Sequence, residues 1–294
     1  MKEIVIYNNK ISEIPNNFIY ENQTLNIPSN IVLENPLRIT IKDDHLELFK
    51  VVLGKNSNVK IILEILNNTT AASKYNIEFL GEENSNLKYL LISELNSKDG
   101  LISHKFDLER NASMDILSGF VSDILDGKMA VNLNGEGSYA NIRAVALSSD
   151  ENNQKVDVLI THNAPHTIGD MTNVGIANKK GKVLLNGIAK INKSMKEANA
   201  FQTLKGIITS DDAEIEVNPI LLIDEYDVKA GHGATIGKLD EEILYYLQSR
   251  GLTKKAAEKL VIHGFLKPII DEIDDELLKE RFMSLVNIRI WLMY

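Results

Sequence analysis

The chain has 294 residues, 44% of them hydrophobic, and a formal net charge of −9. This size and apolar content are enough to bury a full core, as one large domain or two modest ones. The sequence contains no cysteine, which excludes disulfides, thiolate catalysis and any thiolate-ligated metal site made by this chain alone.

The charge and hydropathy patterns exclude further classes. Lysines and acids are interspersed and form no basic stripe, which argues against non-specific nucleic-acid binding. No apolar run reaches the ~18 residues that a membrane helix needs, and the Met-Lys-Glu-Ile start lacks the pattern of a secretory signal. We therefore expect a folded cytoplasmic protein with no membrane insertion.

Residues 1–36 are predicted to form an N-terminal arm. They contain one strand candidate, Glu3 to Tyr7, and the remainder is rich in asparagine and interrupted by Pro15, Pro28 and Pro36. Because proline cannot donate to a sheet ladder, long strands are not expected here.

Residues 37–236 are predicted to form a β-solenoid. From Leu37 the apolar residues alternate with polar ones, which is typical of half-buried strands. A degenerate repeat, in which a small residue is followed by x-apolar-x-apolar, begins at Ser57, Ser85, Ala112, Ser138, Gly181 and Ala213, at spacings of 28, 27, 26, 43 and 32 residues. Such spacings suit solenoid coils of two or three strands. An antiparallel meander with similar turns remains the alternative.

The long spacing of 43 residues predicts an excursion around His162 to Asn173. Within it, Thr161-His-Asn-Ala-Pro-His-Thr167 carries two histidines four residues apart, a spacing that a helix uses for metal binding. The proline disfavours a helix. We therefore expect His162 on a strand and His166 in the following turn, in structural roles. Gln202 either faces solvent or joins an amide ladder, and the pattern does not decide between these.

His232 lies where the chain changes from strand to helix patterns. It stands between Gly231 and Gly233, with Thr235 close behind. Because glycine adopts positive φ without strain, these residues are predicted to shape a tight turn from which the imidazole projects. A histidine in such a turn is a candidate metal ligand, although most turn histidines are ordinary surface residues.

Residues 237–294 are predicted to form a helical domain. Asp240 and Thr253 are candidate N-caps, and Gly251 is expected to end the first helix. In the second helix Ala257, Val261, Phe265 and Ile269 recur every four residues, and Pro268 is expected to kink or end it. A third amphipathic segment spans Glu276 to Met293.

This helical domain carries more apolar surface than a solenoid cap requires. It either packs entirely on the β-core or presents a docking surface for another protein. Tyrosine and arginine are enriched at the centres of interfaces, which favours docking. The candidate partner-binding residues are Tyr245, Tyr246, Arg250, Leu260, Val261 and Phe265.

The segment AGHGATIGKLDEEILYYLQSRGLTKKAAEKLVIHGF, from Ala230 to Phe265, resembles the C-terminal signature of the SufB/SufD family of iron–sulfur cluster assembly proteins. The resemblance extends upstream through the 162–167, 198–204 and 218–228 segments. Gly231-His-Gly-Ala-Thr235 and the absence of cysteine are similar to the SufD branch. Members are commonly longer and begin with a helical domain, so we expect a short form that lacks this domain.

The resemblance implies a right-handed parallel β-helix with a C-terminal helical domain that docks the ABC-type ATPase SufC. It implies a non-catalytic scaffold that pairs through its β-helix with SufB or with a second copy of itself. His232 is then a candidate ligand for iron or a transient cluster at that interface, and no cofactor is expected to be bound tightly by this chain alone.

Two other functions are compatible with the sequence patterns. One is a β-solenoid enzyme acting on carbohydrate, with carboxylates along a groove, although no signal segment is present and the acids are scattered. The other is a homodimeric assembly factor that does not handle a cluster. The common nucleophile, zincin, nucleotide and calcium motifs are absent, and the family resemblance implies a protein that is not an enzyme.

Overall fold

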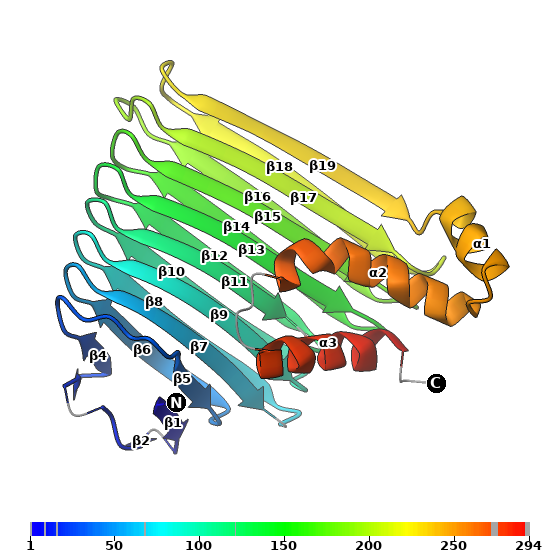
Figure 1. Ribbon diagram of the computed structural model, residues 1–294, viewed down its shortest axis with the longest axis horizontal. Coiled ribbons are helices and arrows are strands. Elements are labelled where there is room, and N and C mark those ends of the chain that lie inside the picture. Colours follow the sequence, from blue (N-terminus) through cyan, green and yellow to red (C-terminus); the bar gives the residue numbers. More distant parts are fainter. Residues whose placement is uncertain are drawn as a thin grey trace.

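The computed structural model of this protein describes residues 2–8, 10–15, 17–67, 69–120, 122–271 and 276–291. These residues form a parallel β-solenoid followed by three helices (Figure 1). Successive strands alternate between two facing sheets, so each coil contributes one strand to each sheet. The predicted solenoid is confirmed, with two strands per coil.

In the part of the chain that the structure describes, one sheet has ten strands and the other nine. The ten-stranded sheet contains β1 (Lys2–Tyr7), β2 (Lys10–Ile11), β5 (Leu37–Ile41), β7 (Asn58–Asn67), β9 (Asn86–Leu95), β11 (Ser113–Phe120), β13 (Tyr139–Ser148), β15 (Ile168–Ala177), β17 (Asn199–Ile208) and β19 (Lys229–Lys238). The nine-stranded sheet contains β3 (Ile19–Glu21), β4 (Thr24–Ile27), β6 (His45–Leu53), β8 (Ala72–Gly81), β10 (Asp99–Leu108), β12 (Leu125–Leu133), β14 (Asn153–His162), β16 (Lys182–Ile191) and β18 (Glu214–Ile223).

Neighbouring coils pair in parallel and in register. β7 and β9, for example, match residue for residue from Asn58 against Asn86 to Asn67 against Leu95. Antiparallel pairs join only β1 with β2 and β3 with β4 among the described strands. This pairing excludes the antiparallel meander.

The main core fills the space between the two sheets. In-register neighbours share a face, so inward side chains stack in rows along the solenoid axis. One such row, which we call the central row, runs through Ile61, Tyr89, Ile116, Ile142 and Met171. All five residues are buried in the main core.

The predicted excursion around residues 162–173 is wrong, because this segment is an ordinary turn followed by β15. Ser57, Ser85, Ala112 and Ser138 precede strands of the ten-stranded sheet, whereas Gly181 and Ala213 precede strands of the other sheet. The missing repeat begins at Thr167. Its inward position is Gly169, where a Cβ would lie 2.9 Å from Nε2 of His162, so the buried imidazole takes the place of the expected apolar side chain.

The N-terminal arm is the first coil of the solenoid as well as its cap. The predicted strand is confirmed as β1, which pairs in parallel with β5, and β4 pairs with β6. Phe18 is buried in the main core, and Ile11 and Ile14 pack against that core. The arm therefore covers the interior of the solenoid at its N-terminal end.

The helices are α1 (Glu241–Ser249), α2 (Lys254–Ile270) and α3 (Glu276–Trp291), and Met293 of the predicted third segment lies outside the described residues. Both predicted N-caps are confirmed: Asp240 accepts hydrogen bonds from the N–H groups of Glu242 and Ile243, and Thr253 accepts one from Ala256. Gly251 follows α1 with a φ of +94°, a conformation that favours glycine. α2 continues two residues past Pro268.

α2 and α3 cover the outer face of the ten-stranded sheet (Figure 1). A second apolar cluster fills this layer, and it includes Ile92, Val145, Ile176, Ile262, Leu266 and Phe282. Phe282 lies directly over Gly119 of β11, where the ring occupies the space that a Cβ would need. Close approach of α3 to the sheet therefore depends on glycine at this position.

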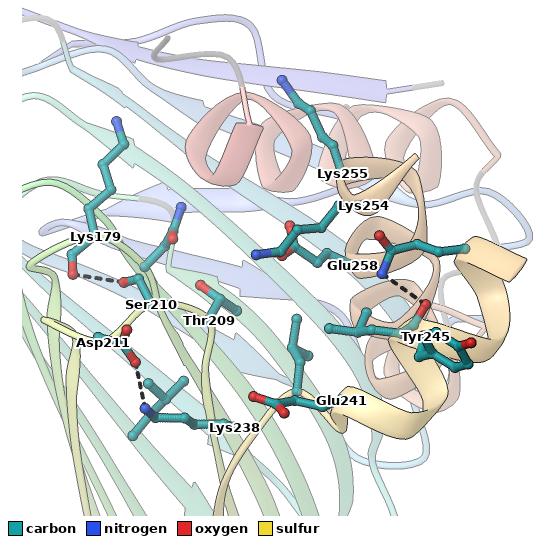
Figure 2. Close-up of a pocket in the computed structure, with 15 residues that line it drawn as sticks. Lys179, Thr209, Ser210, Asp211, Lys238, Glu241, Tyr245, Lys254, Lys255 and Glu258 are labelled. Atoms are coloured by element: carbon teal, nitrogen blue, oxygen red, sulfur yellow. Dashed lines mark hydrogen bonds and ion pairs between the residues drawn. The ribbon is translucent and has the colours of Figure 1, made fainter. Parts of the chain in front are cut away.

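A cleft of about 950 Å³ separates α1 and α2 from the loops at one corner of the solenoid (Figure 2). Two of the lysines that line it are paired with acids that also line it. Lys238 lies 2.6 Å from Asp211, and Lys254 lies 3.9 Å from Glu258. The cleft is a junction between the solenoid and the helices that is lined by both lysines and acids.

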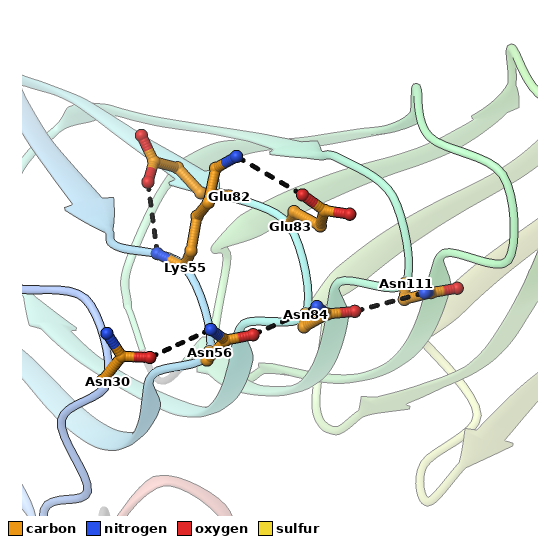
Figure 3. Close-up of polar contacts among 7 residues, drawn as sticks. All are labelled: Asn30, Lys55, Asn56, Glu82, Glu83, Asn84 and Asn111. Atoms are coloured by element: carbon orange, nitrogen blue, oxygen red, sulfur yellow. Dashed lines mark hydrogen bonds and ion pairs between the residues drawn. The ribbon is translucent and has the colours of Figure 1, made fainter.

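Asparagines hold the turns of successive coils together. Asn30, Asn56, Asn84 and Asn111 all have positive φ, which asparagine tolerates better than most residues. Their side-chain amides form a ladder in which Nδ2 of each asparagine after the first donates to Oδ1 of the asparagine one coil earlier, at 2.9, 3.0 and 3.1 Å (Figure 3). The ladder gives a structural role to asparagine at the same place in four successive turns.

An ion pair between a half-buried arginine and a buried carboxylate attaches α3 to the sheet. Arg281 contacts Glu64 of β7, which is only 3% exposed, and its other terminal nitrogen lies 3.7 Å from Glu94 of β9. A carboxylate this deeply buried is costly unless it is paired.

We expect Arg281→Met to lower the free energy of unfolding by about 3–5 kcal/mol, because it leaves Glu64 buried without its partner. Replacing both residues, as Arg281→Met with Glu64→Leu, should recover most of that loss. Urea unfolding at neutral pH measures both variants. Equal destabilisation of the single and double variants would show that the ion pair is not what matters.

Candidate functional site

The C-terminal end of the solenoid is open. β18 and β19 are the last strands of their sheets, so one edge of each has no β-partner in the described chain. Most of their residues are exposed or half-buried, unlike those of the preceding coils. Exposed apolar residues gather on this final coil and the strand beside it: Phe201, Ile220, Leu222, Ile223, Tyr226 and Ile236.

His232 lies in the middle of β19, paired in register with Gln202 of β17. The predicted tight turn is therefore wrong, because Gly231, Gly233 and Thr235 are also strand residues. Glycines on both sides of a histidine fit a turn locally, but pairing with β17 holds this segment extended. The strand nevertheless presents the imidazole at the open end.

His232 points toward the solenoid interior. Its strand neighbours settle this orientation, because Ala230 packs on an interior cluster and Ile236 approaches the inward-facing Gly206. His232 therefore continues the central row, one coil beyond Gln202. It is exposed and makes no hydrogen bond or ion pair with any described residue.

Gln202 faces neither solvent nor an amide ladder, the two alternatives left open by its sequence. It is 2% exposed, and its neighbours in the central row are Met171 and His232. Its Nε2 donates to the backbone carbonyl of Ile220 at 3.0 Å, while its Oε1 is buried and has no partner among the described residues. The row thus changes from apolar to polar as it reaches the open end.

The predicted partner-binding residues lie on α1 and α2. Tyr245, Tyr246, Leu260 and Phe265 are 75%, 55%, 51% and 46% exposed. The guanidinium of Arg250 lies 5.2 Å from the ring centroid of Tyr246, within cation–π range. These residues are large, apolar or aromatic, and available for contact.

Val261 does not share this exposed surface, because it packs against the apolar cluster between helices and sheet. The face of α2 that covers the sheet instead includes Ile262, Leu266, Ile269 and Ile270. Positions four apart advance about 40° around a helix at each step. The every-four pattern therefore drifts around the helix and its members do not share one face, since Ala257 and Ile269 are buried whereas Phe265 is exposed.

His162 and His166 occupy the predicted strand end and turn. His162 is fully buried, and its Nδ1 lies 2.7 Å from Oγ1 of Thr167. Because that hydroxyl donates to the carbonyl of Ala164, it accepts from His162, which fixes the Nδ1–H tautomer. His166 lies 3.4 Å from Glu197. No group of three or more metal-ligating side chains occurs among the described residues.

His104 is a second buried histidine, inside the solenoid. Its Nε2 lies 2.9 Å from the hydroxyl of Tyr89, and its ring stacks on Phe106. Burial lowers the pKa of His104 to about 3 and that of His162 to about 4. Both imidazoles are therefore neutral parts of the core.

These shifts predict loss of stability in acid. The folded-state pKa values lie below the ordinary value of about 6.5, so the unfolded chain binds protons that the folded chain refuses. The contribution of these two histidines to the free energy of unfolding is fully present above about pH 6.5. It is lost as the pH falls toward their folded-state pKa values of about 3 and 4. The Tyr89→Phe, His104→Phe double variant should show a shallower decline, measured by urea unfolding at several pH values. An unchanged slope would contradict a role for His104.

No helix in the described chain is long and apolar enough to cross a membrane.

Comparison with known proteins identifies relatives over most of the solenoid. A family model described as "SUF system FeS cluster assembly, SufBD core domain" matches residues 42–265. The chain is 38% identical over 156 residues to the iron-sulfur cluster assembly protein SufD of Bacillus subtilis (strain 168), which covers 53% of this chain and 36% of the relative.

Two further relatives are more distant. SufD of Escherichia coli (strain K12) is 26% identical over 167 residues, covering 57% of this chain and 40% of the relative. The iron-sulfur cluster assembly protein SufB of Bacillus subtilis is 25% identical over 202 residues, covering 68% of this chain and 43% of the relative. The aligned region spans less than half the length of each relative.

Proposed function

We propose that this chain, which belongs to the SufBD family of iron–sulfur cluster assembly proteins, acts as a non-catalytic scaffold subunit on which a cluster is assembled. The observation that carries the proposal is the position of His232. It stands at the open end of the solenoid, without a partner among the described residues, in a chain that has no cysteine.

His232 supplies one ligand for iron or for a cluster, which is the cargo of the scaffold. Neutral imidazole binds iron well, and histidine replaces cysteine at one iron of some two-iron clusters. The remaining ligands are chiefly thiolates in such sites. Because this chain contains no cysteine, a partner supplies them, and the site is complete only at an interface.

The open end is the surface that forms this interface. Unpaired strand edges and exposed apolar side chains are costly features that proteins normally cover. β18 and β19 offer both, together with Leu222 and Tyr226. The partner that completes a thiolate-ligated site is a SufB-like subunit, because a second copy of this chain brings no cysteine. Pairing with a second copy, the other partner that the family resemblance implies, covers the open end without completing such a site.

The exposed faces of α1 and α2 form a second, separate interface. Tyr245, Tyr246, Leu260 and Phe265 are exposed there, with Arg250 beside Tyr246. We assign this surface to an ABC-type ATPase of the SufC kind. ATP hydrolysis then moves helices that pack directly on the solenoid, which transmits the movement to the interface at the open end.

The ligand role is tested by co-expression with SufB and SufC partners. We expect His232→Ala to leave the purified complex intact while lowering the cluster formed under anaerobic conditions by about tenfold or more, since one ligand is lost. Visible absorption measures the cluster, and size-exclusion chromatography measures the complex. His45→Ala, which changes an exposed histidine near the other end of the solenoid, is the matched control. Cluster yield equal to wild type in His232→Ala removes the ligand role.

If the two interfaces are separate, a substitution in one should not affect binding at the other. Tyr246→Ala and Leu260→Ala should each weaken ATPase binding by about tenfold, as expected for central interface residues, without affecting pairing of the solenoids. Leu222→Asp should weaken pairing of the solenoids, because it places a charge on the last coil. It should leave ATPase binding unchanged. Pull-down of each partner from each variant measures this. Loss of both partners from every variant would show that the two surfaces are not separate.

A further inference from the structure

Gln202 carries an unsatisfied hydrogen-bond acceptor in the core. Its residue is 2% exposed, its Nε2 donates to the carbonyl of Ile220, and its Oε1 has no partner among the described residues. Ile220 presents an acceptor, so the amide nitrogen must face it, and the oxygen is necessarily the unpaired atom. Folded proteins leave few buried acceptors unpaired, because each costs stability.

The solenoid itself does not require an amide at this position. The five residues before Gln202 in the central row are isoleucine, tyrosine, isoleucine, isoleucine and methionine. A side chain of similar shape, such as methionine, fills the same interior without a desolvated polar group. The amide therefore needs an explanation other than packing.

The nearest position along the row holds an unpartnered donor. His232 lies in register with Gln202 on the adjoining strand, on the same face. Neighbouring strands are about 4.8 Å apart, which places the two side chains within reach of one another. Gln202 is held by Ile220, whereas His232 is exposed and unanchored in the described chain, so the imidazole is the group that turns.

We propose that Gln202 is the positioning residue of His232: its Oε1 accepts one imidazole N–H, which leaves the other ring nitrogen unprotonated and directed out of the open end. Metal-binding histidines commonly donate their second N–H to a carbonyl or carboxylate that fixes the tautomer and the ring orientation. Here an interior amide takes that role. The inference deepens the proposed function and rests on it for its purpose.

A neutral amide suits this role better than a carboxylate. Glutamate at this position would stabilise the protonated imidazolium, whose nitrogens both carry hydrogen and cannot bind metal. Glutamine accepts the same hydrogen bond without adding a charge to a buried row.

The test is a direct measurement of the His232 tautomer, without iron or a partner. Protein labelled with ¹⁵N-histidine is studied by long-range ¹H–¹⁵N correlation about two pH units above the ordinary histidine pKa, where the imidazole is neutral. The His232→Asn variant assigns the signal. His162, held as the Nδ1–H tautomer by Thr167, provides an internal reference in the same spectrum.

We expect wild-type His232 to favour one tautomer by about fivefold or more, the equilibrium effect of an ordinary hydrogen bond. Gln202→Met, which keeps the volume but removes the amide, should return the ratio to that of a free imidazole. Gln202→Asn, which keeps the amide but shortens its reach, should do the same. Asn173→Leu is the matched control, because Asn173 has another buried and unpartnered amide oxygen but lies in the neighbouring row, in register with Leu204.

Unchanged His104 and His162 signals confirm that each variant keeps its core. Equal tautomer ratios in wild type, Gln202→Met and Gln202→Asn overturn the proposal, as does a shift in the Asn173→Leu control equal to theirs. The outcome is independent of the cluster assay. If His232→Ala forms as much cluster as wild type while the tautomer still depends on Gln202, the positioning stands and the ligand role fails.

Discussion

Each coil of this solenoid needs a neighbour on both sides. The backbone hydrogen bonds of one strand are completed by the next coil, and the inward side chains of one coil cover those of another. At the N-terminal end much of this requirement is met within the chain, because the short strands β2 and β3 pair with β1 and β4 and Phe18 is buried in the core. At the other end β18 and β19 are left with unpaired edges. The unpaired end is a direct consequence of the architecture, and it is where His232 lies.

The interior of the solenoid changes along its axis. Most of the central row is apolar, and its last two members are Gln202 and His232. A polar group in a closed core reduces stability, but the same group beside an open end is available for binding. Elsewhere the buried histidines are neutral and held by hydroxyl groups, His162 by Thr167 and His104 by Tyr89. Position along the axis, more than residue type, separates the candidate ligand from the structural histidines.

The helices are attached to the solenoid by both apolar packing and charge. Phe282 lies over Gly119, and Arg281 neutralises the buried Glu64. A partner bound to the exposed side of α1 and α2 thus contacts α2, whose opposite side rests on the ten-stranded sheet. This arrangement gives a physical route from helix docking to the coils, without any contact between that partner and the open end.

The sequence by itself determined the strand alternation, the approximate coil length and both helix caps, because each depends on local chemistry or on regular spacing. It did not reveal that His232 lies in a strand, since the glycines beside it fit a turn until β17 pairs with them. Nor did it reveal the repeat at Thr167, which His162 conceals by filling the space above Gly169. The inward direction of Gln202, its unpaired oxygen and its place beside His232 depend on the register between distant strands. Only the tertiary structure decides that register, because residues about thirty positions apart come together only when the coils stack.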